Sequence, residues 1–463
     1  MKKVSIHIRA LTMCLAATIL SSCAYSDQSS SISASFPDSQ ATSETSSSAS
    51  NKNLGSIEDD VPSNEITLGK ALQISGKSTR ANSKALADNE IQVADQSEQL
   101  YPLVYGNNTI LFEEMVYDAN GSSFTLYKYN VNEGALSQIG NYAYDYRYEN
   151  GTILDDRYYF RAPCVVDDGG NLIVQWQKID CNTGEMEIVY SETVQSLYTF
   201  QKSCDNDQIY LMVDAVRGDT YTPTILSYSI STDECRIIYQ AETNQRSVPF
   251  EKKRPWVYDV SPDQIAVMQI QQRSDEKYVY SMLILDRDGN RLREFEISAL
   301  TPYSARNCNP FKLETVGNTF FTRIYDPQEE PPTVAFDGKG NNISFPENLT
   351  NYPDELLWKH PYKDVFLFST LPDNFDFEES RYSSQLYLFF DDQTTLIPLE
   401  VDSINSNRHI FFGNSLGDIL AFESSNSSFG KEEILPASEI EEAIDNRLEE
   451  TNESYDEHSQ HER

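Results

Sequence analysis

Short apolar segments that alternate with polar turns recur along the chain at nearly constant intervals. One kind of unit is an aromatic or aliphatic segment that ends in a turn rich in Asp, Asn or Gly. It occurs six times, at Phe124–Asn130, Val174–Asp180, Thr224–Ile230, Tyr280–Asp286, Thr333–Asp337 and Leu386–Asp391. The last residues of these units lie 50, 50, 56, 51 and 54 positions apart. Because Asp, Asn and Gly adopt the backbone conformations of tight reversals, each unit predicts a strand followed by a hairpin turn.

A second kind of unit, a polar turn followed by a short apolar strand, interleaves with the first. It occurs seven times, with strands at Ile110, Tyr158, Ile209, Ile265, Phe320, Phe366 and Ile419. These positions are 48, 51, 56, 55, 46 and 53 residues apart. Short strands that return about every 50 residues predict the four-stranded blades of a β-propeller. A pair of β-sandwiches would also give many short strands, but it would not keep a steady register.

The fold class that follows is all-β: a β-propeller with four antiparallel strands in each blade. Seven blades are favoured and six are the alternative. The segment Ser261–Val267, SPDQIAV, resembles the repeat of TolB-type propellers, in which SPDG precedes an apolar strand, and the resemblance implies the same fold.

The sequence shows seven units of the second kind but only six of the first. The last blade therefore lacks an identified outer pair of strands. Either Ile66–Ile74 and Glu90–Ala94 supply its outer pair from the N-terminal side, or Lys431–Leu435 does so from the C-terminal side. The first option is favoured because both termini then close the ring and no strand edge stays open.

The pattern changes after Pro436. Ser438 and Glu441 form a capping box, and five residues at helical spacing fall on one stripe: Ile440, Ala443, Ile444, Arg447 and Leu448. A short helix is therefore expected, with an acidic disordered tail from Glu449 onward. The propeller domain is expected to span residues 65–436, and the helix and tail residues 437–463.

The first residues carry an export signal. Lys2, Lys3 and Arg9 precede an apolar run, Ala10–Leu20, that is interrupted only by two threonines. Eleven residues suit a signal peptide, whereas a membrane-spanning helix needs roughly 20. Residues 1–22 are therefore predicted to be a signal peptide.

The residues Leu20, Ser21, Ser22 and Cys23 resemble the bacterial lipobox. The resemblance implies a bacterial lipoprotein, with a diacylglyceryl group on the Cys23 thiol and cleavage just before it. An ordinary signal peptide followed by a chance cysteine is the alternative. Two acyl chains suffice for stable anchoring. The expected location is the extracytoplasmic side of the bacterial cell membrane, with the membrane as a partner through the lipid.

Residues 23–64 are predicted to be a disordered tether. Twelve serines fall between Ala24 and Ser50 among few large apolar residues, so this stretch cannot bury enough surface to offset the entropy of ordering. A coil of this length spans about 35 Å.

The chain is strongly acidic, with 36 Lys and Arg against 72 Asp and Glu. Such a surface repels nucleic acid, so DNA and RNA are excluded as partners. No stretch of 18 apolar residues follows the signal peptide, so the lipid is the only anchor expected.

Five cysteines remain beyond Cys14 and Cys23, and an odd number leaves at least one thiol unpaired. They are Cys164, Cys181, Cys204, Cys235 and Cys308. The extracytoplasmic compartment permits disulfides, and Cys204 with Cys181 or Cys235 is the pair we expect. The alternative is that all five are small buried apolar residues without bonds.

Two motifs resemble nucleotide-binding or catalytic sites. Ala71–Ser78 fits a loose phosphate-loop pattern, but its flank is polar and no metal-binding strand follows. Gly413–Gly417, with Ser415 at its centre, matches the nucleophile elbow of serine hydrolases, which requires a helix after the serine. Here a strand is expected instead, so a blade turn is the favoured interpretation.

Two groups resemble metal ligands. Asp286, Asp288 and Asn290 match half of a calcium loop without its closing glutamate, so a hairpin turn is favoured. His458 and His461 lie in the acidic tail, where no third ligand is apparent. The sequence thus predicts no metal site and no cofactor.

Aromatic residues alternate along one predicted strand and share a face: Tyr142, Tyr144, Tyr146 and Tyr148. They could stack on a sugar, but packing between blades is the favoured interpretation. No catalytic residue can be singled out, because no pair of carboxylates stands out among 72 and the only histidines between Cys23 and the tail are His360 and His409.

Two functions stay open. The favoured one is a non-catalytic binding or assembly module of the cell envelope that recognises a protein or glycan through one face of the propeller. The alternative is a carbohydrate-active enzyme with carboxylates at the propeller mouth. An enzyme of that kind needs two inward acids about 5 to 10 Å apart with room for a sugar.

Overall fold

A computed structural model describes seven β-sheets within the unit Pro62–Arg463. The described residues are 65–74, 79–80, 101–118, 121–143, 151–195, 200–273, 277–304, 308–325, 333–346, 349, 353–360, 363, 365–370, 385–390, 395–401, 409–423 and 433–447. The predicted signal peptide and tether, with Cys23, lie outside them.

Each sheet is one blade, and the blades follow one another along the chain. Blade 1 contains β4 (Tyr101–Tyr105), β5 (Thr109–Asp118), β6 (Gly121–Asn130) and β7 (Ala135–Ala143). Blade 2 contains β8 (Thr152–Leu154), β9 (Tyr158–Arg161), β10 (Cys164–Val166), β11 (Leu172–Asp180) and β12 (Met186–Thr193). β9 and β10 pair with successive parts of β11, so they form one interrupted strand.

Blades 3 to 5 repeat this order. Blade 3 contains β13 (Phe200–Ser203), β14 (Gln208–Arg217), β15 (Thr220–Ser229), β16 (Glu234–Gln240) and β17 (Asn244–Gln245). Blade 4 contains β18 (Arg254–Val260), β19 (Ile265–Gln272), β20 (Tyr278–Leu285) and β21 (Arg291–Glu296), and the short helix η1 (Ser298–Tyr303) follows it. Blade 5 contains β22 (Asn309–Val316), β23 (Thr319–Tyr325), β24 (Thr333–Phe336) and β25 (Asn342–Ile343).

The last two blades take strands from before blade 1. Blade 6 contains β26 (Pro353–Lys359), β27 (Val365–Thr370), β28 (Leu386–Phe390) and β29 (Thr395–Val401), with β1 (Thr67–Leu68) and β2 (Leu72–Ile74) parallel to β29. Blade 7 contains β30 (His409–Gly413), β31 (Ile419–Glu423) and β32 (Glu433–Leu435), and β3 (Thr79–Arg80) completes it.

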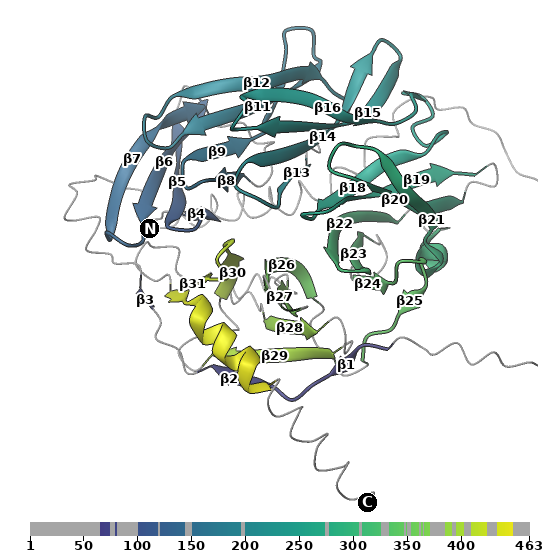
Figure 1. The fold of residues 1–463 in the computed structure, drawn as a ribbon. Helices are drawn as coiled ribbons and strands as arrows, with labels where there is room; N and C mark the ends of the chain where they lie inside the picture. Colours follow the sequence, from purple (N-terminus) through teal and green to yellow (C-terminus); the bar gives the residue numbers. More distant parts are fainter. Residues whose placement is uncertain are drawn as a thin grey trace, which may run out of the picture. The chain divides into compact units, whose positions relative to one another are not determined.

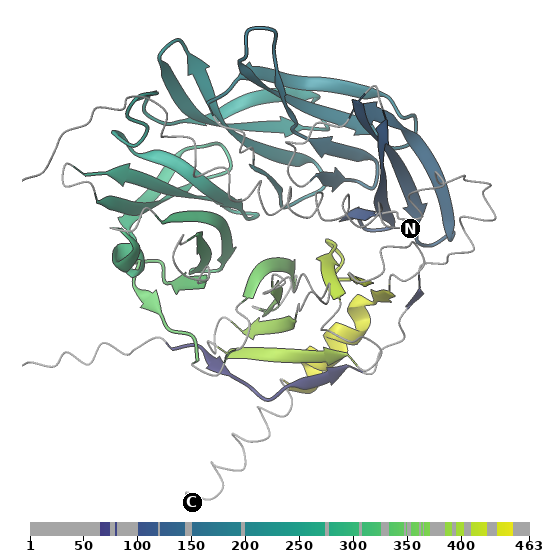
Figure 2. The ribbon, with the colours of Figure 1, turned by 180° about the vertical axis from the view of Figure 1, so that it is seen from behind.

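The seven blades form a closed ring (Figures 1 and 2). β4, β8, β13, β18, β22, β26 and β30 are the innermost strands, and each of them contacts the next around the full circle. The structure therefore confirms an all-β propeller of seven blades, mostly of four strands.

Apolar clusters between neighbouring blades explain why the ring holds. In the described part, the buried apolar residues form seven clusters, and each one joins two adjacent sheets. Between blades 5 and 6, for example, Phe321 packs on Phe368 and Phe389 with ring centroids 5.1 and 5.6 Å apart. Alternating apolar residues give every sheet two faces to bury, and a closed ring covers both.

The expected closure of the last blade is wrong in part. Its third strand, β32, comes from the C-terminal side, whereas Ile66–Ile74 lies along blade 6. The reason is packing, because Ile66 and Leu68 join the cluster between blades 5 and 6, and Leu72 joins the cluster between blades 6 and 7. Glu90–Ala94 lies outside the described residues.

A helix at residues 437–447 follows blade 7. Its buried residues Ile440, Ala443 and Ile444 belong to the cluster between blades 6 and 7, so the predicted short helix is confirmed and it packs on the propeller. No helix among the described residues has the length and apolar character needed to cross a membrane.

Candidate functional site

The innermost strands around the centre of the ring fall into two groups. We call β13, β18, β22 and β26 of blades 3 to 6 the charged arc, and β30, β4 and β8 of blades 7, 1 and 2 the uncharged arc. The charged arc contains eight Lys, Arg, Asp and Glu residues: Lys202, Arg254, Asp259, Lys312, Glu314, Asp354, Glu355 and Lys359. The three strands of the uncharged arc contain none.

Lys202 joins three blades at the centre of the charged arc. Its Nζ lies 3.1 Å from Oε1 of Glu314 and 3.5 Å from Oδ1 of Asp259. The other carboxylate oxygen of Asp259 accepts the backbone N–H of Thr315 at 2.8 Å. β13, β18 and β22 each supply one of the three charged groups, so the ion pairs exist only when the ring is assembled.

A second pair extends this group towards solvent. Lys312 Nζ lies 3.6 Å from Oε2 of Glu355 on the next blade. The Glu355 side chain is 47% exposed, whereas that of Glu314 is 5% exposed. We call these five residues, Lys202, Asp259, Lys312, Glu314 and Glu355, the channel ion cluster. It runs from a buried carboxyl group to an exposed one.

Burial changes the proton affinity of Glu314. It raises the pKa of the carboxyl group to about 8, although Lys202 opposes the rise. Burial by itself would lower the pKa of Lys202, but Glu314 and Asp259 outweigh it, so that pKa lies above its usual range. Two ammonium groups thus face three carboxyl groups. When Glu314 holds a proton, the channel ion cluster is electrically neutral.

The arrangement of the two buried acids matters for catalysis. Glycosidases keep their two carboxyl groups about 5 to 10 Å apart so that a sugar or a water molecule fits between them. Here Lys202 Nζ lies between Glu314 and Asp259 and contacts both. The ammonium group therefore stands where the substrate of such a pair would have to bind.

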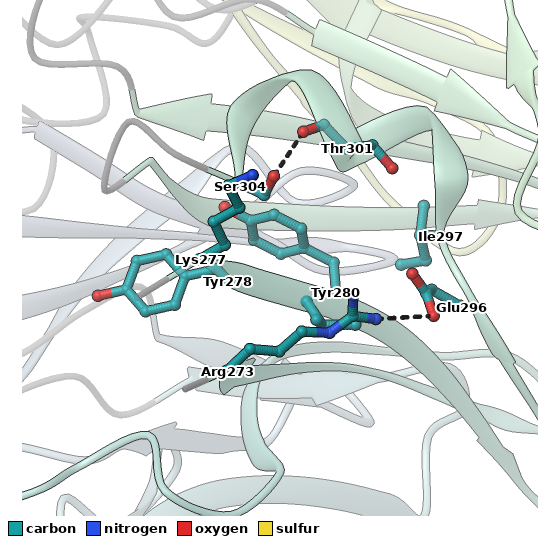
Figure 3. A pocket seen from close by; sticks show the side chains of 9 residues that line it. Arg273, Lys277, Tyr278, Tyr280, Glu296, Ile297, Thr301 and Ser304 are labelled. Carbon is teal, nitrogen blue, oxygen red and sulfur yellow. Dashed lines mark hydrogen bonds and ion pairs between the residues drawn. The ribbon is translucent and has the colours of Figure 1, made fainter. Parts of the chain in front are cut away.

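Blade 4 carries two adjoining hollows at its outer side. Arg273, Val279 and Glu296 line both, and the hollows measure about 200 and 400 Å³. The smaller one lies between β20 and η1, with Thr301 and Ser304 across from Arg273 (Figure 3).

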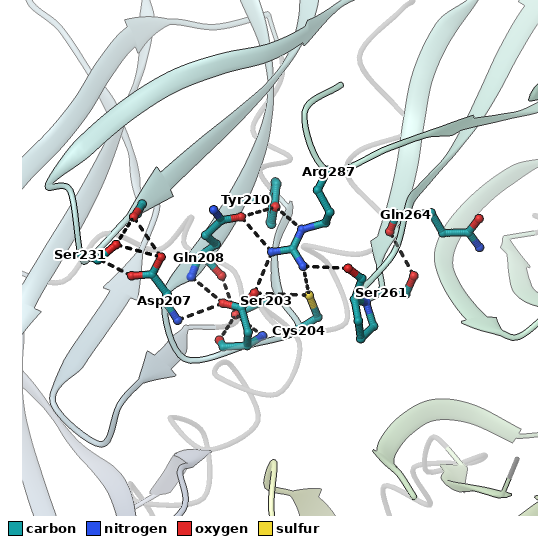
Figure 4. A network of polar contacts seen from close by, with 12 residues as sticks. Ser203, Cys204, Asp207, Gln208, Tyr210, Ser231, Ser261, Gln264 and Arg287 are labelled. Carbon is teal, nitrogen blue, oxygen red and sulfur yellow. Dashed lines mark hydrogen bonds and ion pairs between the residues drawn. The ribbon is translucent and has the colours of Figure 1, made fainter. Parts of the chain in front are cut away.

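A polar network around Arg287 joins blades 3 and 4 (Figure 4). The guanidinium donates to Oδ2 of Asp205 at 2.7 Å, to Oε1 of Gln208 at 2.8 Å and to the hydroxyl of Tyr210 at 2.5 Å. It also donates to Sγ of Cys204 at 3.1 Å. All of these acceptors belong to blade 3, so the arginine fastens one blade to the next.

The expected disulfide is wrong. Cys181, Cys204 and Cys235 carry free thiols because they lie in three different apolar clusters, between blades 1 and 2, 3 and 4, and 2 and 3 respectively. Burial raises the pKa of the Cys204 thiol to about 11, so it is not a reactive thiolate. Cys164 and Cys308 are buried, as expected of small apolar residues.

The two turn interpretations are confirmed. Asn290 donates its backbone N–H and its Nδ2 to the carboxylate of Asp286, both at 2.8 Å. Gly289, at φ 88°, lies so close to the carbonyl oxygen of Ile238 that a Cβ would be 1.8 Å from it, so only glycine fits. The segment between β30 and β31 folds in the same way.

In the turn between β30 and β31, Asn414 takes the position that Asp286 has in the first turn, and Asp418 takes the position of Asn290. Asn414 Oδ1 accepts the backbone N–H of Asp418 at 2.9 Å, and Gly417 has φ 91°. Ser415 is exposed, and its hydroxyl hydrogen-bonds to Asn107 of blade 1. A strand follows the turn, so the helix that a nucleophile elbow needs is not there.

The other sequence candidates are dispersed. Leu72–Ile74 of the phosphate-loop match is strand β2, and residues 75–78 lie outside the described part. Tyr142 is buried and donates to the carbonyl of Gly184 at 3.0 Å, which confirms packing for that residue. His360 is buried against Trp358, at 5.2 Å between ring centroids. Tyr144, Tyr146, Tyr148, His458 and His461 lie outside the described residues.

The channel ion cluster was not found from the sequence, although a signal was present. Lys202, Asp259 and Glu314 fall at spacings of 57 and 55 residues, close to the repeat length. Among the described residues, no group of three or more His, Cys, Asp and Glu is placed to hold a metal ion.

The fold and the channel define the class as a seven-bladed β-propeller. No family model matches the sequence, and no curated protein matches it. Solved structures of similar fold include the β-propeller domain of the Trilobed protease from Pyrococcus furiosus, with a TM-score of 0.45 and 10% identity over 73% of this chain and 92% of that one.

Two further solved structures are similar to the chain. Pyrococcus horikoshii acylaminoacyl peptidase gives a TM-score of 0.42 and 12% identity, over 70% of this chain and 49% of that one. Oligogalacturonate lyase from Vibrio parahaemolyticus gives a TM-score of 0.39 and 13% identity, over 78% of this chain and 97% of that one. At such identities the likeness concerns the fold alone.

Proposed function

We propose that the chain is a lipid-anchored, extracytoplasmic binding or assembly module of the bacterial cell envelope. In this proposal it performs no catalysis and recognises a protein or glycan through one face of the propeller, where the exposed Glu355 contributes to binding. The membrane is its second partner, through the lipid on Cys23.

One observation carries the non-catalytic part of the proposal. Lys202 contacts both Glu314 and Asp259, so the gap between the two buried acids holds an ammonium group. A cleaving pair needs that gap for substrate. A ligand can instead meet the partly exposed end of the channel ion cluster, where fixed charges select a partner by complementarity.

A carbohydrate-active enzyme is the second candidate, and one observation favours it. A carboxyl group with a pKa of about 8 is protonated near neutral pH, which a general acid requires. Glu314 would then protonate the leaving group, and Lys202 would have to move away from Asp259 first.

A single assay separates the two candidates. The full-length protein, purified in detergent, is applied to an array of bacterial envelope glycans and to peptidoglycan fragments, and bound and released sugar are both measured. The proposal predicts retention without release of products, and weaker retention for Glu355→Gln. Release of products that both Glu314→Gln and Asp259→Asn abolish would establish the enzyme. Full retention by Glu355→Gln would place the ligand elsewhere.

The anchor has its own test. Cells fed an alkyne-labelled fatty acid are expected to label the protein, and Cys23→Ser is expected to lose the label and most of the membrane association. The matched control is Cys14→Ser, which changes a cysteine inside the predicted signal peptide. A Cys23→Ser protein that still carries the label would contradict lipidation at this residue.

A further inference from the structure

The outermost strand of blade 2 has an unpaired side. β12 pairs with β11, and no other described strand pairs with it (Figure 1). Its outward backbone N–H and C=O groups are therefore open to a further strand. Met186 and Ile188 on this strand are large apolar residues, yet they are 45 and 47% exposed. We call the outward side of β12, with Met186, Glu187 and Ile188, the blade 2 edge.

Blade 6 shows how such an edge is covered in this fold. β1 and β2 pair with β29, the fourth strand of that blade, and run parallel to it. Leu68 of the added segment packs into the apolar cluster between blades 5 and 6, and Leu72 packs into the cluster between blades 6 and 7. An extended segment along an outer edge thus supplies side chains to the interfaces on both sides of its blade. Blade 2 has no described counterpart of β1 and β2.

The two faces of the blade 2 edge differ in chemistry. Met186 lies opposite Ile179 of β11, which packs between blades 1 and 2, and Ile188 follows Met186 on the same face. Glu187 lies on the other face, where its carboxylate is 2.8 Å from Nζ of Lys178. Side chains that lie opposite each other on neighbouring strands share a face. A strand added here would therefore place its side chains alternately beside the apolar pair and beside Glu187.

The charge of the blade 2 edge favours cationic side chains on the second face. Residues 185–193 contain three acids and no Lys or Arg: Glu185, Glu187 and Glu192. The cations that contact these acids are already engaged, because Lys178 also pairs with Asp233 at 2.9 Å and Arg217 pairs with Glu192 at 2.6 Å. The whole chain carries a net charge of −36. A second copy of this edge would be repelled, whereas Lys or Arg residues of a partner would be attracted.

We propose that the blade 2 edge binds an extended segment of a partner protein in which aliphatic residues alternate with Lys or Arg. The aliphatic side chains lie beside Met186 and Ile188, the cationic ones lie beside Glu187, and backbone hydrogen bonds join the segment to β12. This surface is separate from the one in the proposed function. Either proposal can fail alone, because no variant used below touches the channel ion cluster.

Designed peptides test the proposal on the full-length protein in detergent. The probe is a fluorescent peptide of eight residues, the length of β12, in which Val and Lys alternate. The protein is expected to raise the fluorescence anisotropy of this probe, and a peptide with Glu in place of Lys is expected not to bind. Two further probes carry methyl groups on the backbone nitrogens of either the Val or the Lys residues. Because the N–H groups of only one set point to β12, one methylated probe should lose binding and the other should keep it.

Two variants at comparable positions complete the test. Ile188→Lys is expected to weaken binding of the Val–Lys peptide about tenfold, because it removes an apolar contact and adds a like charge. Leu292→Lys is the matched control, since Leu292 is 58% exposed on β21, the outer strand of blade 4, and the net charge changes equally. This variant is expected to bind like the parent. A thermal unfolding curve for each variant shows that the ring is intact.

Several results would overturn the proposal: no binding of the Val–Lys peptide, equal binding of the Val–Glu peptide, equal behaviour of the two methylated probes, or equal losses in the two variants. Sedimentation of the protein in density-matched detergent tests the other occupant, a second copy of the chain. A dimer that dissociates in Ile188→Lys would assign the blade 2 edge to self-association, and the partner segment would be wrong.

Discussion

The charged arc and the uncharged arc hold equivalent positions in the ring, yet neighbouring innermost strands meet through different contacts. In the charged arc, Lys202 links blades 3, 4 and 5 by ion pairs. In the uncharged arc, Leu103 and Val104 of β4 pack into the same apolar cluster as Ile153 of β8. The innermost strands of blades 1 and 2 therefore meet through apolar side chains, although Asp156 of blade 2 also accepts the backbone N–H of Asn108 of blade 1.

This difference supports the channel ion cluster as the site in the proposed function. A buried ion pair is weak evidence for stability, because desolvation of the charges opposes their attraction. Positions that break the local rule of apolar burial are expected at functional sites. Glu314 and Asp259 break that rule on the innermost strands, as Glu114 does on the second strand of blade 1, because all three are buried acids.

The largest expected effect is that of removing the shared cation. Lys202→Met leaves Glu314 and Asp259 without their ammonium partner, so the free energy of unfolding should fall by about 3 kcal/mol. Urea denaturation at pH 9, where Glu314 has lost its proton, measures it. The triple variant Lys202→Met, Asp259→Asn, Glu314→Gln should recover most of the loss. An unchanged urea midpoint for Lys202→Met would show that the ion pairs of Lys202 do not stabilise the folded protein.

The second largest effect is a pH dependence of stability that comes from the charged arc alone. The folded protein holds the Glu314 proton up to about pH 8, whereas the ordinary pKa is 4.5. The native state thus binds more protons between these values, so stability falls as pH rises through this window and levels off above it. One such proton gives a slope of at most about 1.4 kcal/mol per pH unit.

The matched measurement uses Glu314→Gln, which should flatten that slope when urea midpoints are compared between pH 5 and pH 8. A slope that survives in Glu314→Gln would mean that another group titrates there. The uncharged arc should not contribute to this dependence.

A change in the uncharged arc should have a smaller effect that is independent of pH. Ile153→Val removes one buried methylene group between blades 1 and 2, at a cost of about 1 kcal/mol. The loss is expected to be equal at pH 6 and pH 8. A loss that changes with pH would contradict the division of the channel into two arcs.

The smallest effect is expected at the exposed end of the channel ion cluster. Lys312 and Glu355 are 3.6 Å apart and partly solvated. Lys312→Gln should therefore change stability by only about 0.5 kcal/mol. The difference from the parent should disappear in 1 M salt, where the screening length is about 3 Å. A loss as large as that of Lys202→Met would show that the cluster acts as one unit.

Most of the fold could be predicted because its signal is local. All seven strands predicted from the second unit are the second strands of their blades, from Ile110 in β5 to Ile419 in β31. All six of the first unit are third strands. Apolar alternation and turn residues within a few positions determine them.

The channel ion cluster could not be singled out in the same way. Its residues belong to different blades. In a chain with 72 acids, a buried carboxylate can be recognised only from its charged partners on neighbouring blades, and the sequence does not show those partners. The sequence also did not predict that β1 and β2 join blade 6. Both strands are short, and their partner β29 lies more than 300 residues away. Contacts at that separation leave no periodic trace in the sequence.

The join in blade 7 has a consequence for the order of assembly. β3 comes before β4, the first strand of blade 1, in the sequence. Its partners in blade 7, β30, β31 and β32, are the last strands to be synthesised. During synthesis, the first strand of the final sheet must therefore wait with open hydrogen-bonding edges until nearly the whole polypeptide has emerged. A truncated product that ends before β32 would keep the first six blades but leave β31 and β3 without their shared partner strand. Proteases that degrade misfolded proteins can recognise such unpaired strand edges.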